Sequence, residues 1–137
     1  MNYSNFYARF YTFLQRLGVA FKRIFKFQYT KIYLGIIVFM QLLVWLQTIA
    51  IYRRLTGDFI ILHYNIDFGV DLIGSPKRIF YYPLFGLGVA IINISLAAIL
   101  ARHKEPRLVI HFMLGAAVAF AIFLSLALLA VNFINFK

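Results

Sequence analysis

Three long apolar stretches constrain the fold of this chain more than any other feature. They cover about residues 32–52, 79–100 and 109–132, and each is close to or above the roughly 20 apolar residues that a helix needs to cross a bilayer. Hydrophobic residues make up 64% of the 137 residues and charged residues only 13%. A soluble domain of this length could not bury so much apolar surface. The sequence therefore predicts an all-α membrane protein with three transmembrane helices.

The segment before the first span, residues 1–31, is basic and amphipathic. Its polar residues recur at steps of three or four, which leaves a broad apolar surface on a helix. A secretory signal does not fit, because charges interrupt the apolar stretch. We expect an interfacial helix on membrane lipid, although a helix packed on the cytoplasmic face of a partner protein has the same pattern. The cations expected to meet lipid headgroups are Arg9, Arg16, Lys22, Arg23 and Lys26.

The distribution of charge predicts how the chain is oriented. The net charge is +10, and most cations flank the apolar spans, which indicates membrane insertion rather than nucleic-acid binding. Residues 1–31 hold six cations and no acid, and residues 101–108 hold three cations and one acid, whereas residues 53–78 hold four cations and three acids. The positive-inside rule places the N-terminus and the 101–108 connection in the cytoplasm, and the 53–78 loop and the C-terminus outside. The chain divides into the N-terminal segment 1–31 and a transmembrane domain, 32–137.

A few polar residues lie within the spans. Gln41 and Gln47 are expected to face neighbouring helices, because an unpaired amide in lipid is costly. Asn93 and Ser95 are the polar residues of the second span. His111 lies near a membrane edge, and an interfacial imidazole with a hydrogen-bond partner explains it better than a proton relay, since no span holds an acidic residue.

Small residues follow two stripes of the third span. They allow close helix packing, either within the chain or between copies of it. The helix-packing residues are Gly115, Ala117, Ala119, Ala121 and Ser125.

The polar loop 53–78 holds the candidate functional residues. An extended segment is expected at 59–66, with turns at Gly69, Gly74 and Pro76. Extended backbone would point the side chains of His63, Asn65 and Asp67 to one side. This set lacks the second His or bidentate Glu of a dependable metal site, so no metal or cofactor is expected. The alternative is a turn-rich cap whose side chains bond to the loop backbone.

The loop also resembles a known one. The pattern His63-x-Asn65, Gly69-x-Asp71, Gly74-x-x-Lys77 between two spans is similar to a loop in a bacterial membrane domain of unknown function, which also occurs in the immunity protein against the Sdp killing toxin. The similarity covers roughly residues 58–90. It departs where prolines usually precede the His and where Pro76 interrupts the Gly-Ser-Lys sequence, and here there are three spans. The whole chain also resembles small uncharacterised membrane proteins of bacteria with reduced, AT-rich genomes. The resemblance implies the bacterial cytoplasmic membrane.

Three classes of function follow from these features. The first is a non-enzymatic accessory or immunity-like subunit that contacts another membrane protein or a second copy through the third span and the outer loop. The loop residues expected at that contact are His63, Asn65, Asp67, Gly69, Asp71, Gly74 and Lys77. The second class is an oligomeric transporter or channel protomer. The third is a membrane enzyme, for which His63 with Asp67 or Asp71 is the only acid–base set in the loop, and we expect no catalytic residue.

Overall fold

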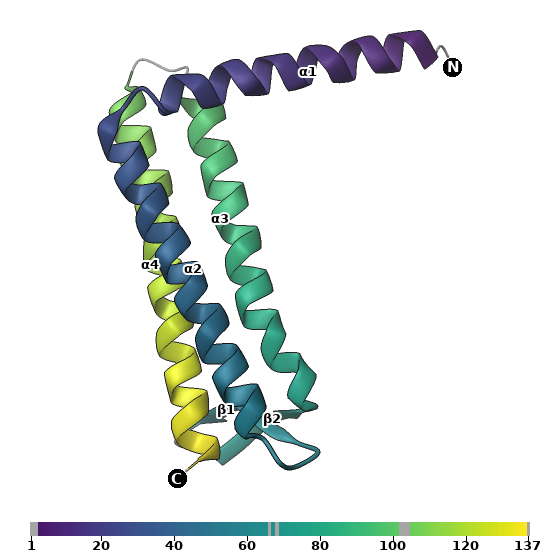
Figure 1. Ribbon diagram of the computed structural model, residues 1–137, viewed down its shortest axis with the longest axis vertical. Helices are drawn as coiled ribbons and strands as arrows, with labels where there is room; N and C mark the ends of the chain where they lie inside the picture. The colour runs from purple at the N-terminus through teal and green to yellow at the C-terminus, as the bar shows by residue number, and fades with distance from the viewer. Residues whose placement is uncertain (1–2, 66, 68, 102–104, 137) are drawn as a thin grey trace.

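The computed structural model describes residues 3–65, 67, 69–101 and 105–136. Four α-helices, one short 3₁₀ helix and a β-hairpin follow one another along the chain (Figure 1). Their bounds, in chain order, are α1 Tyr3–Ile24, α2 Gln28–Arg54, β1 Ile60–Asn65, β2 Gly69–Gly74, the 3₁₀ helix η1 Pro76–Phe80, α3 Tyr81–Leu100 and α4 Pro106–Asn135.

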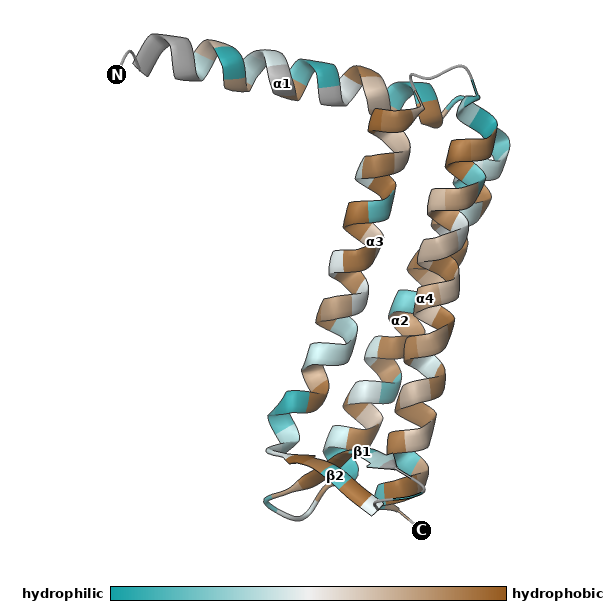
Figure 2. Ribbon diagram, turned by 180° about the vertical axis from the view of Figure 1, so that it is seen from behind, coloured by the Kyte–Doolittle hydropathy of each residue, from teal (hydrophilic) through white to brown (hydrophobic). Residues whose placement is uncertain are grey.

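Three of these segments are long and apolar enough to cross a membrane, which confirms the predicted class. They are α2, η1 with α3, and α4, and each extends beyond the apolar stretch that predicts it. Figure 2 shows hydrophobic residues along these helices and hydrophilic ones in α1 and at the two ends of the bundle. The helix α4 is the centre of the bundle, because it packs extensively on both α2 and α3, whereas α2 and α3 have less contact with each other.

Only one of the two stripes of small residues on α4 lies at the contacts of α4 with its neighbours. Ala117, Ala121 and Ser125 are buried inside the chain, so this stripe serves the internal contacts of α4. Ala119 lies exposed on the other stripe, and a Cβ added at Gly115 would meet nothing within 4 Å. The two stripes therefore have different surroundings.

The amides within the spans bond inside the bundle, as expected for polar groups in lipid. The Nε2 of Gln41 donates to the carbonyl oxygen of Pro83 at 2.6 Å, which ties α2 to the first turn of α3. The hydroxyl of Ser125 donates to the Oε1 of Gln47 at 3.1 Å, which ties α4 to α2. Asn93 donates to the carbonyl oxygen of Val89 within its own helix.

The loop between α2 and α3 folds into an antiparallel hairpin. The predicted extended segment is β1, but a second strand, β2, was not predicted. Gly69 and Gly74 mark the two ends of this strand instead of lying in separate turns. Gly69 has a φ of +79°, a conformation that glycine adopts without the steric cost of a side chain. The register is irregular on both sides of His63, which changes the alternation of side chains along β1.

The helix α1 runs across one end of the bundle and points away from it, while the hairpin and the C-terminus lie at the opposite end (Figure 1). Ala20 and Ile24, near the end of α1, are buried in one cluster with Ala97, Ala98 and Ile110. The last turns of α1 are thus part of the bundle core, and the rest of α1 extends beyond it.

Candidate partner-binding hairpin

The strand β1 is fixed to the end of α4 by a single side chain. The backbone N–H of Ile61 donates to the Oδ1 of Asn135 at 2.9 Å, and the Nδ2 of Asn135 donates to the carbonyl oxygen of Ile61 at 2.8 Å. The same Nδ2 donates to the carbonyl oxygen of Val131 within α4. The amide therefore satisfies both backbone groups of Ile61 in the way that a neighbouring strand would.

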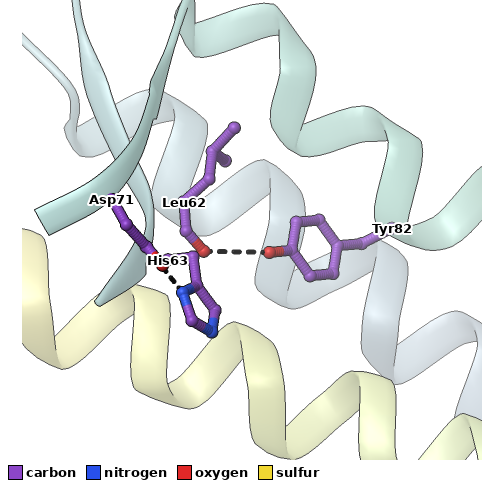
Figure 3. A network of polar contacts seen from close by, with 4 residues as sticks. All are labelled: Leu62, His63, Asp71 and Tyr82. Atoms are coloured by element: carbon purple, nitrogen blue, oxygen red, sulfur yellow. Dashed lines mark hydrogen bonds and ion pairs between the residues drawn. The ribbon is translucent and has the colours of Figure 1, made fainter. Parts of the chain in front are cut away.

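A tyrosine of α3 holds the next residue of β1. The hydroxyl of Tyr82 donates to the carbonyl oxygen of Leu62 at 3.1 Å (Figure 3). The side chains of Ile60 and Leu62 are buried with Ile79 and Leu128, in a cluster that closes this end of the bundle. Two helices thus bind the backbone of β1, and apolar burial holds its side chains.

The two candidate side chains His63 and Asp71 form a pair across the hairpin. The Nδ1 of His63 donates to the Oδ1 of Asp71 at 2.6 Å (Figure 3). The two side chains are 61% and 42% exposed, respectively. An exposed side-chain pair of this kind, even when both groups are charged, contributes only about 0–1 kcal/mol to stability. The pair therefore leaves polar groups accessible on the hairpin and is not needed to hold it together.

The other predicted loop residues lie in different surroundings. Asn65 pairs with Gly69 through the backbone, and Asp67 lies in the turn between the strands, beyond the end of β1. The expectation that His63, Asn65 and Asp67 share one side of an extended segment is therefore wrong for Asp67, because the chain has already turned there. Lys77 is exposed in η1.

Gly74 has a structural role. A Cβ at this position would lie 2.7 Å from the Cδ of Arg78 and 3.1 Å from the Cδ1 of Leu62. The absence of a side chain at Gly74 thus allows β2 to turn into η1 close to β1. Gly69 likewise serves the turn through its positive φ. Neither glycine brings a side chain to the hairpin surface.

The strand β2 carries a surface that sequence reasoning missed. The apolar side chains of Val70, Leu72 and Ile73 are exposed, as is Phe59 just before β1. The strand contacts β1 extensively and has no comparable contact with a helix. Within the described part of the chain, β1 is its only strand partner, so one edge of β2 is open. The apolar residues within 70–73 could have predicted a strand. The glycines on either side, Gly69 and Gly74, favoured the prediction of turns instead.

The acid–base pair of the hairpin, His63 and Asp71, lies at the surface. Within the described ranges, no three His, Asp or Glu side chains come together in a way that could hold a metal ion. An enzyme base usually acts on a substrate enclosed in a cleft, whereas His63 is largely exposed. The arrangement is suited to surface contact.

Polar aromatic residues gather at the opposite end of the bundle. The ring of His111 stacks on that of Tyr29 at a centroid distance of 4.4 Å, and its Nδ1 shares a hydrogen bond of 3.2 Å with the hydroxyl of Tyr33. The imidazole thus has a partner near the start of α4, as the interfacial interpretation predicts. It joins α2 to α4 at this end.

Comparisons of the chain with protein-family models, with curated proteins and with solved structures found no match. The resemblance of the loop to the Sdp immunity protein thus remains a prediction from the sequence. The functional argument rests on the geometry of the hairpin and of the bundle.

Proposed function

We propose that the protein is a non-enzymatic integral membrane protein that acts as an accessory subunit, and that its hairpin contacts another polypeptide. The observation that carries this proposal is the contrast between the two strands. Asn135 and Tyr82 bind the backbone of β1, while β2 has an open edge and exposed apolar residues. A strand held in place on one side presents the other side with little loss of conformational entropy on binding.

The chemistry of the open edge indicates the kind of contact. An edge strand offers unpaired N–H and C=O groups, which an extended segment of another polypeptide can pair with. The side chains of Val70, Leu72 and Ile73 flank that edge and would add apolar contacts. The pair of His63 and Asp71 would add polar groups beside them.

The proposed location is the bacterial cytoplasmic membrane, with the hairpin and the C-terminus outside and α1 on the cytoplasmic side. The distribution of cations supports this orientation, since residues 1–31 and 101–108 are the most basic connections. The loop resemblance supports an immunity-like role, in which an outer loop binds a toxin or a larger membrane complex.

The polar groups inside the bundle give less support to the alternative of a transporter or channel protomer. Gln41, Gln47 and Asn93 each bond within the chain. Groups that line a conduction path are expected to face a water-filled cavity instead. A flux assay with the purified protein in liposomes tests this alternative, and transport of an ion or solute above background would favour it.

Site-specific photo-crosslinking in native membranes tests the proposed contact. A photoreactive phenylalanine analogue replaces Leu72 on β2 in one variant and Phe123, which is exposed on α4, in the control. We expect a discrete protein adduct at position 72 and a weaker one or none at position 123. Asp71→Asn, introduced beside the analogue at position 72, should lower the adduct yield. Equal yields at both positions would contradict a contact centred on the hairpin.

A further inference from the structure

The rotation of α1 about its own axis is fixed by the bundle. Ala20 and Ile24 are 1% and 0% exposed. The helix α1 contacts α3, and both residues belong to the buried cluster that includes the end of α3 and Ile110 of α4. Phe10 and Leu14 lie on the same side of the helix at steps of three and four residues, but they extend beyond the bundle and are about half exposed. The helix α1 runs across the end of the bundle (Figure 1). Because Ile24 is buried in the bundle, the side of α1 that carries Ile24 would face the lipid if the bundle crosses a membrane.

Three arginines form a row along one flank of α1. Arg9, Arg16 and Arg23 are spaced seven residues apart, which places them on one line about 60–100° around the axis from Ile24. Side chains on such a flank lie where lipid headgroups meet water. There is no acidic residue before Asp58 in the chain, so no carboxylate of α1 competes for these guanidinium groups.

Two shallow grooves lie between successive arginines of this row. The first has a volume of about 400 Å³ and is lined by Ala8, Arg9, Thr12 and Arg16. The second has a volume of about 460 Å³ and is lined by Thr12, Gln15, Arg16, Val19, Ala20 and Arg23.

The lining of these grooves suits an anion. The hydroxyl of Thr12, which is common to both, donates to the carbonyl oxygen of Ala8. The guanidinium groups of the arginines are the cationic donors that line the grooves. Small side chains such as Ala8 and Thr12 leave the space between those groups open.

Two of the five cations expected at lipid headgroups lie outside the row. Lys22 is about 160° around the axis from Ile24, on the side that faces away from the lipid. Lys26 follows the end of α1. The two lysines therefore lie apart from the arginine row, Lys22 on another side of α1 and Lys26 beyond its end.

We infer that the grooves Arg9–Arg16 and Arg16–Arg23 each bind the phosphate of one anionic phospholipid headgroup. The planar guanidinium groups match phosphate oxygens in a bidentate manner, and the apolar side of α1 holds the row at headgroup depth. An anionic lipid is preferred over a zwitterionic one, because both grooves are basic and neither is lined by a carboxylate. This inference does not depend on the proposed contact of the hairpin.

The test is native mass spectrometry of the full chain in mild detergent. Phosphatidylglycerol and phosphatidylcholine are titrated separately, and inorganic phosphate is then added to the complex with phosphatidylglycerol as a competitor. We expect two retained phosphatidylglycerol molecules, with binding weakened about fivefold for each arginine removed. The triple variant R9Q/R16Q/R23Q should therefore lose both molecules. The matched control K22Q/K26Q/K31Q removes the same charge away from the row and should keep them.

Three results would overturn the inference. Equal losses in the two triple variants would indicate general attraction between charges. Equal retention of phosphatidylcholine would indicate that acyl chains alone bind. Full displacement of phosphatidylglycerol by inorganic phosphate would indicate a site for a soluble anion. Where the triple variant does not insert, Arg16→Gln alone removes the arginine common to both grooves, and unchanged retention of both lipids in that variant would also contradict the assignment.

Discussion

The side-chain amide of Asn135 pairs with both backbone groups of Ile61, through bonds of 2.9 and 2.8 Å. The two residues are 74 positions apart in the sequence, and their pairing joins the last turn of α4 to the first strand of the hairpin. The side chain of Asn135 forms the two backbone hydrogen bonds that a neighbouring strand would form with Ile61. It therefore covers the outer edge of β1 at this residue, whereas the outer edge of β2 stays open. This asymmetry gives the hairpin one fixed side and one presented side.

Asn135→Ala should release β1 from the bundle. The change leaves the part-buried N–H and C=O of Ile61 without their partners, and a fully buried group left unpaired costs about 1–3 kcal/mol. Hydrogen exchange at the amide of Ile61 should rise strongly while the transmembrane helices stay protected. Asn132→Ala is the control, since the side chain of Asn132 has no hydrogen bond to the hairpin in the described part of the chain. Equal exchange in the two variants would show that Asn135 does not anchor the strand.

His63→Ala and Asp71→Asn should separate binding from folding. The pair is exposed, so its loss should lower the free energy of unfolding by less than about 1 kcal/mol. Thermal unfolding in detergent measures this change, and the cross-linking yield from position 72 measures binding. We expect near-native stability with a reduced adduct. A loss of insertion or folding comparable to that of Asn135→Ala would mean that the pair is structural.

Gly86→Ala should destabilise the contact between α2, α3 and α4. The added Cβ would lie 2.7 Å from the Cδ1 of Leu124 and 3.1 Å from the Oε1 of Gln41, and Gln41 is held by its bond to Pro83. Such overpacking costs about 1–3 kcal/mol. At Gly88 an added Cβ meets nothing within 4 Å, so Gly88→Ala should be neutral or stabilising by up to about 1 kcal/mol. Thermal unfolding of both variants in one detergent tests this contrast, which the opposite order of stabilities would refute.

Gly69→Ala should disturb the turn of the hairpin and little else. A residue with a side chain at a φ of +79° is strained by about 1–2 kcal/mol. Asn tolerates this region better, so Gly69→Asn should recover part of the loss. Hydrogen exchange along 60–74 measures the effect, and Gly57→Ala is the control, since its added Cβ would contact nothing within 4 Å. Similar exchange in Gly69→Ala and Gly57→Ala would argue against strain at the turn.

The sequence predicted the three spans because length and hydropathy alone decide which segments can cross a bilayer. It also predicted that Gln41 and Gln47 bond to other helices, because lipid offers no partner to an amide. The strand β2 was missed, since its few residues between two glycines resemble a turn until β1 pairs with them. Asn135 was missed because its role requires the end of α4 to lie beside a strand that is distant in the sequence. The difference between the two small-residue stripes of α4 likewise depends on which side α2 and α3 occupy.

The claim that unites these proposals is that the two ends of the bundle lie on opposite sides of the membrane, with the hairpin outside and α1 inside. The chain has no cysteine, so single cysteines at Lys77 beside the hairpin and at Lys22 on α1 report each end separately. Both lysines are exposed. Intact cells treated with a membrane-impermeant maleimide should label Lys77→Cys, and Lys22→Cys should react only after the membrane is opened. Labelling of both from the outside, or of Lys22→Cys alone, would contradict the account.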